Sequence, residues 1–156
     1  MNIKLNANAL VTNSKGEILL IRLKKGPFAG GLCIPGGGVI PGELSHVAAR
    51  REVLEETGID IEGKFMPYGF CELRSDTVDQ HKIVMLLHAR GEGVPQETEE
   101  GSASWMSYED AEKDLIAFAR EAIRIWKNKE VHFKLTDDEV DIRHFPTKSL
   151  NGGNLN

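Results

Sequence analysis

The sequence predicts an α/β fold organised as one main domain. Apolar residues alternate with polar ones near the start of the chain, a glycine-rich segment then leads into a helical pattern, and further strand patterns precede a second, amphipathic helix. The chain has 156 residues, of which 40% are hydrophobic and 28% charged. This length supports one well-packed core and is too short for two ordinary domains.

Two strands are expected first, joined as a hairpin. Every second residue from Ile3 to Val11 is apolar, and the turn "NSKG" leads to a second strand over residues 17–25. The short apolar run "LCIP" follows a glycine-rich loop. The next segment, "PGGGVIPGE", is too rich in glycine and proline to form a regular helix.

A helix is expected over residues 45–57. Val47, Arg51 and Leu54 fall on one stripe at helical spacing. Gly58 follows directly, and glycine suits the left-handed conformation in which helices commonly end.

Two more strands are expected beyond this helix, over residues 59–74 and 81–90, with the polar segment "SDTVDQ" between them. Residues 92–103 are rich in glycine and polar side chains, so we expect a loop there. The run "VHFKL" predicts a further short strand near residue 135.

The last helix is expected after Ser107, which begins a Ser-x-x-Asp pattern typical of a helix start. Its predicted buried face carries Leu115, Phe118, Ala119, Ala122 and Trp126. We assign residues 1–135 to the folded domain. Residues 136–156 form a polar C-terminal extension, which we expect to be partly flexible.

Charge and hydropathy exclude several classes of protein. A formal net charge of −5 is unsuited to binding a nucleic-acid polymer, which needs a broad basic face. No apolar run approaches the roughly 18 residues of a membrane span, and the N-terminus lacks the apolar region of a signal peptide. We therefore expect a cytoplasmic protein without membrane contact.

Three glutamates crowd one face of the expected helix. Glu52 lies three residues before Glu55 and four before Glu56, so the three side chains are neighbours, although like charges at this spacing repel. One interpretation is a solvated acidic face, balanced by Arg50 and Arg51. The other is a cation site, because carboxylate oxygens are the ligands that Mg²⁺ accepts.

The spacing around these glutamates favours the cation site. The pattern runs Gly37, five residues, Glu43, seven residues, Arg51, Glu52, an aliphatic residue, any residue, Glu55, Glu56, any residue, Gly58 and the aliphatic Ile59. At every specified position it resembles the Nudix box, GX5EX7REUXEEXGU with U aliphatic. Average residue usage makes such a match by chance rarer than about one chain in a million.

The resemblance implies a Nudix-type α/β/α sandwich with a mixed β-sheet, and it covers about Ile3 to Asn128. The chain departs from the family pattern at Leu44, where relatives often carry a Ser or Thr that caps the helix. We therefore expect the cap to shift to Ser45.

The resemblance also implies a divalent cation, Mg²⁺ or Mn²⁺ in its place, that neutralises substrate phosphates and activates water. The implied metal ligands are the Gly36 carbonyl and the carboxylates of Glu52, Glu55 and Glu56, with Glu99 or Glu100 as a further ligand. Glu52 would help to deprotonate the attacking water. Arg51 would orient the glutamates, and Glu43 would support them as a nearby acid.

Substrate contacts are implied in the same way. Gly37 and Gly38 would let the backbone approach the phosphates, because glycine has no Cβ. Arg22 matches a phosphate-contacting arginine of MutT-like relatives, although a solvent-facing arginine fits the sequence equally well. We expect the base to lie between the first strands and the segment "WMSYED". Asn6 and Asn8 either contact the base there or face solvent or a neighbouring strand.

The implied function is hydrolysis of a nucleoside diphosphate linked to another group. A MutT-like nucleoside triphosphate pyrophosphohydrolase, which releases a nucleoside monophosphate and pyrophosphate, fits by elimination: the segment "LRSDTV" lacks the proline or tyrosine that marks other specificities. ADP-ribose or a nucleotide sugar is the alternative substrate, and a non-catalytic nucleotide sensor is a further hypothesis. The expected partner is a small nucleotide, and a homodimer is left open.

Overall fold

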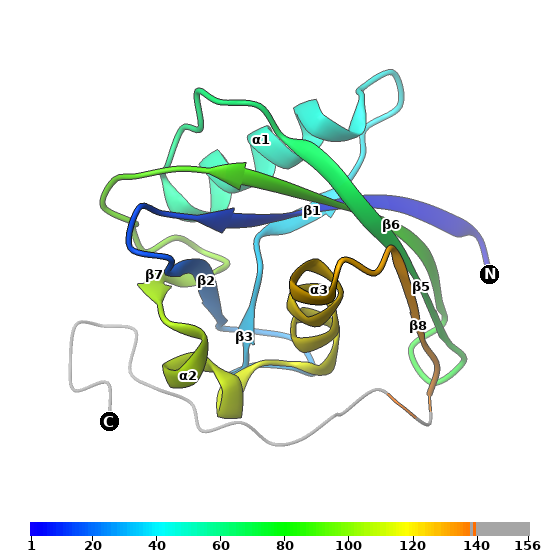
Figure 1. Cartoon of the computed structure of the whole chain (residues 1–156). Helices are drawn as coiled ribbons and strands as arrows, with labels where there is room; N and C mark the ends of the chain where they lie inside the picture. Colours follow the sequence, from blue (N-terminus) through cyan, green and yellow to red (C-terminus); the bar gives the residue numbers. More distant parts are fainter. Residues whose placement is uncertain (138, 140–156) are drawn as a thin grey trace.

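The computed structural model describes residues 1–137 and 139 (Figure 1). Within these residues, eight strands form one mixed sheet with the order β3-β2-β1-β6-β5-β8, while β4 pairs with β1 and β7 with β2. The strands are β1 (Ile3–Thr12), β2 (Ile18–Leu23), β3 (Leu32–Cys33), β4 (Gly36–Gly38), β5 (Met66–Ser75), β6 (Gln80–Arg90), β7 (Gly101–Met106) and β8 (His132–Leu135). The predicted α/β class is confirmed.

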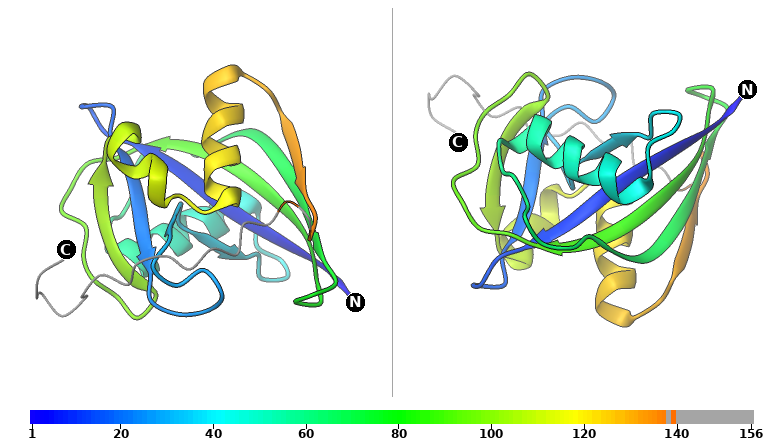
Figure 2. Two further views of the ribbon diagram at one scale, coloured as in Figure 1. Left: turned by 90° about the horizontal axis from the view of Figure 1, so that it is seen from below. Right: turned by 90° about the horizontal axis from the view of Figure 1, so that it is seen from above.

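Helices cover both faces of the sheet (Figure 2). Helix α1 (Ser45–Thr57) lies on one face, and α3 (Ala117–Asn128) lies on the other. The short α2 (Tyr108–Ala111) and the 3₁₀ turn η1 (Glu112–Asp114) lead into α3. This arrangement is the expected sandwich of helix, sheet and helix.

The central strand β1 separates two apolar cores. Ala7, Ala9 and Val11 pack in the core that contains α1, whereas Leu10 packs in the core that contains α3. Along its length β1 pairs in parallel with β6, and it meets β2 in the expected hairpin at Thr12 and Ile18. A strand covered on both faces is apolar on both faces, so simple alternation does not describe it.

The two apolar patterns at the start of the chain and over residues 45–57 do not mark buried faces along their whole length. Ile3 and Leu5 are 64% and 46% exposed, because the start of β1 extends beyond the helices. Val47 and Leu54 are 47% and 45% exposed, because α1 packs through another stripe. The residues of α1 that the sheet buries are Ala48, Ala49, Val53, Glu56 and Thr57. Small alanines allow the helix to approach the alanines of β1 closely.

Helix α1 spans the predicted residues, but its N-terminus differs from expectation. Leu44 is the N-cap, with no side-chain hydrogen bond, so the expected shift of the cap to Ser45 was wrong. At the other end, Gly58 has φ +75° and its N–H donates to the Leu54 carbonyl at 2.9 Å, which confirms the predicted glycine cap.

Two strands were missed because their partners are distant in sequence. Strand β4 consists of three glycines that pair with Asn6, Ala7 and Asn8 of β1. Strand β7 lies partly within the predicted loop and pairs along the whole of β2. In β7, a Cβ at Gly101 would overlap the Arg22 carbonyl, so this close approach requires glycine.

The second half of the chain follows the prediction more closely. Strands β5 and β6 pair antiparallel, and the predicted last strand is β8, which pairs in parallel with β5. Ser107 caps α2, with its side chain accepting a hydrogen bond from the Asp110 N–H at 3.2 Å, but α2 ends at Ala111 and the long helix α3 begins only at Ala117. The single helix predicted from Ser107 onward was therefore wrong, and Leu115 lies between helices. Of the predicted face of the last helix, Ala119 and Ala122 are fully buried and Trp126 packs at the margin of the core.

Most of the predicted extension, 136–156, lies outside the described residues, of which only 136, 137 and 139 belong to it. No helix within the described part of the chain is long and apolar enough to cross a membrane.

Candidate active site

The three box glutamates of α1 line one hollow. This hollow of about 310 Å³ is lined by Glu52, Glu55, Glu56, Thr98, Glu99 and Glu100. The loop before β7 reaches the end of α1 through two hydrogen bonds: the Gln96 N–H donates to the Thr57 carbonyl at 2.8 Å, and Thr98 Oγ1 donates to the Glu56 carbonyl at 3.2 Å. The fold therefore brings both Glu99 and Glu100 to the box, although the sequence left the choice between them open.

Strand β4 holds two of these carboxylates against bare backbone. The Gly36 N–H donates to Glu56 Oε1 at 2.9 Å. A Cβ at Gly37 would lie only 2.5 Å from Glu52 Oε1, so the Glu52 carboxylate occupies the space that a side chain would fill. At Gly38 a Cβ would meet nothing within 4 Å. A side chain at position 37 would therefore displace the Glu52 carboxylate.

Arg51 connects the carboxylates to one another. It binds Glu43 through two hydrogen bonds, Nε to Oε2 at 2.9 Å and Nη2 to Oε1 at 3.0 Å. Its Nη1 donates to Glu52 Oε1 at 2.9 Å and to Glu55 Oε2 at 3.3 Å, and Nη2 also donates to the Gly38 carbonyl at 3.0 Å. These bonds lower the pKa of Glu43 below its usual range. The geometry is that of an arginine that orients glutamates.

Glu56 differs from its neighbours in burial. The residue is 8% exposed, and this desolvation raises the pKa of its carboxyl well above the usual range. The Gly36 N–H opposes the shift, and the negative charges of Glu52 and Glu100 add to it. Ionising all these carboxylates together therefore requires positive charge beyond that of Arg51.

The donor set suits a hard divalent cation, because it consists of carboxylate oxygens next to a glycine backbone. Within residues 1–137 and 139, no three acidic, histidine or cysteine side chains already converge as a metal site. Three contacts hold the box carboxylates in place: Arg51 binds Glu52 and Glu55, and the Gly36 N–H donates to Glu56. Binding a cation would exchange some of these hydrogen bonds for metal–oxygen contacts.

Arg22 is placed differently from the box residues. It is only 7% exposed, and its Nη1 donates to the Gly30 carbonyl at 2.8 Å and lies 3.1 Å from Asp114 Oδ2. It is not among the residues that line the acidic hollow. These contacts anchor the loop before β3. Because Arg22 is buried, the alternative of a solvent-facing arginine was wrong, whereas the expected phosphate contact stays a prediction.

A second, more enclosed hollow of about 320 Å³ lies on the α3 side of the sheet. Its walls come from the loop before β3, from β5 and β6, and from the start of α3, with Phe28, Leu73, Lys82, Ile116 and Phe118 among the residues that line it. Sequence reasoning missed this hollow because its walls are up to about a hundred residues apart in the chain.

Two aromatic side chains of the segment "WMSYED", beside the expected base site, already have partners within the protein. Trp105 Nε1 donates to the Gly93 carbonyl at 2.8 Å, and the Tyr108 ring lies under the Lys127 ammonium, 3.5 Å from it. The Asn8 amide donates to the Ile34 carbonyl at 3.3 Å, so it supports the chain before β4.

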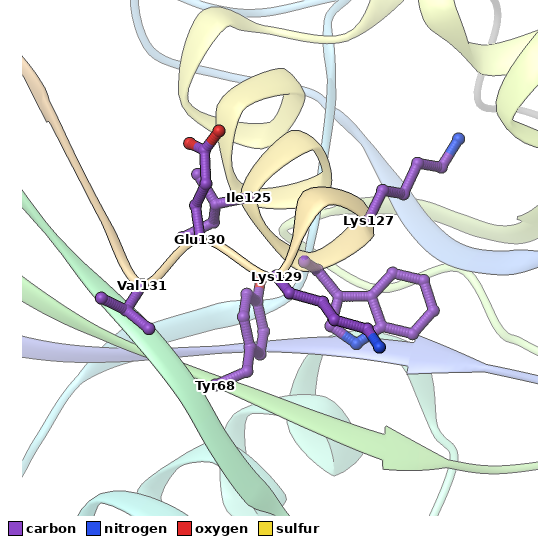
Figure 3. Close-up of a pocket in the computed structure, with 7 residues that line it drawn as sticks. Tyr68, Ile125, Lys127, Lys129, Glu130 and Val131 are labelled. Carbon is purple, nitrogen blue, oxygen red and sulfur yellow. The ribbon is translucent and has the colours of Figure 1, made fainter.

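A wider groove of about 560 Å³ lies at the C-terminal end of α3 (Figure 3). Tyr68, Trp126, Lys129 and Val131 are among its lining residues, and none of them lines the acidic hollow. The Tyr68 hydroxyl donates to the Ala122 carbonyl at 3.0 Å, so this polar group is already bound within the protein.

Comparison with known proteins identifies the family. The model of the NUDIX domain matches residues 3–126. A Bacillus subtilis (strain 168) protein named "Putative 8-oxo-dGTP diphosphatase" is 32% identical over 103 residues, which span 65% of this chain and 64% of that protein.

Two crystal structures are similar at 26% identity. The MutT NUDIX hydrolase from Burkholderia pseudomallei matches 80% of this chain and 98% of its own with a TM-score of 0.68. The MutT protein from Methanosarcina mazei Go1 matches 81% of this chain and 94% of its own with a TM-score of 0.70. With the intact box folded around one acidic hollow, these matches show that the chain belongs to the NUDIX domain family, as its resemblance to MutT-like members implied.

Proposed function

We propose that the chain is a metal-dependent, MutT-like Nudix hydrolase that cleaves a nucleoside triphosphate to a nucleoside monophosphate and pyrophosphate. One observation carries this proposal: Glu52, Glu55 and Glu56 line the same hollow as Glu99 and Glu100. Such a density of carboxylates has no evident structural use, and it suits a divalent cation that carries substrate phosphates.

Hydrolysis of a phosphoric anhydride requires charge neutralisation and an activated water. Mg²⁺, or Mn²⁺ in its place, would supply both when bound by Glu52, Glu55, Glu56 and the Gly36 carbonyl, with Glu99 or Glu100 completing the set. Glu52 lies against Gly37 and is held by Arg51, so its carboxylate is placed to accept the proton of the attacking water.

The two hollows suggest how a nucleotide lies. The Ile116 N–H, beside the enclosed hollow, donates to the Leu32 carbonyl at 3.0 Å. Gly36, which contacts Glu56, is four residues after Leu32, so the two points are at most about 14 Å apart along an extended chain. The base occupies the enclosed hollow, and the phosphates cross the bare glycines of β4 to the glutamates.

A substrate panel tests the proposal. Nucleoside triphosphates, ADP-ribose, nucleotide sugars and dinucleoside polyphosphates are incubated with Mg²⁺, with Mn²⁺ or with excess chelator, and the products are separated by chromatography. We expect triphosphates to yield monophosphate and pyrophosphate only when a divalent cation is present. Faster cleavage of ADP-ribose or a nucleotide sugar would assign the alternative substrate class, and binding without cleavage would indicate a sensor.

A further inference from the structure

Lys82 places an unpaired positive charge in the enclosed hollow. It lies on β6, paired across the sheet with Lys4 of β1 on one side and Leu73 of β5 on the other. The side chain is half-buried and lines the hollow, yet it makes no hydrogen bond or ion pair with any residue in the described part of the chain. An ammonium in such a position costs stability unless a ligand binds it.

The surroundings of Lys82 do not neutralise it. None of the described residues that line the hollow is acidic, and the other cation there, Arg74, already binds Asp76 at 2.9 Å. Burial, together with the charge of Lys4, lowers the pKa of Lys82 below its usual range. Lys82 is therefore the cation in this hollow that a ligand can use as a hydrogen-bond donor.

The walls favour a flat ring over a phosphate group. Phe28, Leu73, Ile116 and Phe118 present apolar surface, and ligand sites of this kind combine such walls with a few polar groups that fix orientation. A phosphate group normally gathers several charged donors or backbone N–H groups, whereas this hollow offers one unpaired ammonium. An aromatic base can pack against the apolar walls with its ring and accept a hydrogen bond from Lys82 at its polar edge.

We propose that Lys82 determines the base specificity of the enzyme by donating a hydrogen bond to a keto oxygen, O6 of a purine or O4 of a pyrimidine. An ammonium is a donor only, so it pairs with guanine O6 and with thymine or uracil O4. Adenine and cytosine carry an amino donor at that position, so they offer Lys82 no acceptor there. This inference rests on the proposed function, because it places the base of the nucleotide in this hollow.

The test compares values of kcat/KM for GTP, UTP, ATP and CTP. The wild type should prefer GTP and UTP, and Lys82→Met, which keeps the apolar stem, should lower that preference by at least about fivefold, the low end for one good base contact. Lys82→Arg keeps the donors and should retain the preference. Lys4→Met removes an equal charge from the exposed start of the neighbouring strand β1 and is the matched control, with the preference unchanged.

Equal kcat/KM for all four nucleotides in the wild type would overturn the inference, and so would equal losses for all four in Lys82→Met. Calorimetric binding of GMP and AMP separates this failure from failure of the proposed function. If no triphosphate is cleaved but GMP binds more tightly than AMP, and Lys82→Met removes the difference, then the inference stands without the activity. If the wild type binds neither, or both equally, the inference is wrong.

Discussion

Glu55 and Glu56 are adjacent in the box, but the structure gives them different surroundings. The Glu55 side chain is 58% exposed and touches Arg51, whereas Glu56 is buried and accepts a hydrogen bond from the Gly36 N–H. The box pattern could not distinguish them, because spacing along a helix specifies which way a side chain points and not how deeply it is buried. Each position therefore needs its own variant.

Changing Glu55 or Glu56 to Gln removes a negative charge at nearly constant shape. We expect each change to lower kcat roughly 10²–10⁴-fold, the range for loss of an acid–base or electrostatic group. The fold should persist, and Glu56→Gln should unfold at an equal or higher temperature, because a buried like-charge contact is relieved. Glu109→Gln, at an exposed site on α2, is the control. Near-normal turnover in both box variants would contradict the metal assignment.

His88 makes the stability of the domain depend on pH. Its Nε2 lies 2.9 Å from Thr12 Oγ1, and its ring packs on Trp126 with centroids 4.9 Å apart. Burial, with the charge of Arg90, lowers the pKa of His88 in the folded state below its ordinary value. The unfolded chain therefore takes up the proton first, and the free energy of unfolding falls as the pH drops below about 6.5.

Urea unfolding of the wild type and His88→Gln at several pH values between 5 and 8 measures this effect. We expect the stability advantage of the wild type to shrink toward pH 5, and His46→Gln, on the exposed side of α1, controls for loss of a histidine. An advantage that is independent of pH would show that His88 does not carry the effect.

The glycines of β4 differ in what a side chain would meet. Gly37→Ala forces its Cβ against the Glu52 carboxylate, whereas Gly38→Ala faces open space. We expect Gly37→Ala to lower kcat at least about tenfold by displacing Glu52, since misplacing a catalytic group by an ångström is costly. Gly63→Ala also faces open space, lies outside the acidic hollow, and is the control that should stay within about threefold of the wild type. Equal effects of Gly37→Ala and Gly63→Ala would remove the argument that Gly37 makes room for Glu52.

The N-terminus of α1 can be improved. Leu44 is the N-cap, is 65% exposed, and offers no hydrogen bond to the first turn. Leu44→Ser supplies the missing acceptor and should raise the free energy of unfolding by about 0.5–1 kcal/mol. Chemical denaturation checks this value, and Leu44→Ala, which removes the apolar side chain without adding a cap, should give no such gain.

Helix α1 was predictable in extent because Gly58 ends it by local chemistry. Its buried face was not predictable, because Leu54 is exposed and Ala49 is buried, whereas hydrophobicity alone would place the leucine in the core. Strand β4 was missed because three glycines have no strand propensity, and only pairing with β1 orders them. Both the buried face of α1 and the formation of β4 depend on tertiary partners, which a local sequence pattern cannot show.

For the whole molecule, the sequence predicted the acidic hollow better than the enclosed hollow. The glutamates of α1 follow one another at fixed spacing, so a single stretch specifies them. The enclosed hollow joins Phe28, Lys82 and Phe118 from three regions of the chain. Arg22 illustrates the limit: its position matched a family pattern, yet Asp114, which no sequence rule pairs with it, holds it in the interior.

In the proposed reaction, the acidic hollow directs water to an internal phosphorus of a nucleoside triphosphate. Turnover of GTP with Mg²⁺ in ¹⁸O-labelled water, followed by mass spectrometry of the products, tests this reaction most directly. We expect GMP and pyrophosphate, with one ¹⁸O atom in one of the two, and no products in excess chelator. GDP with labelled orthophosphate, or equal turnover in chelator, would contradict it.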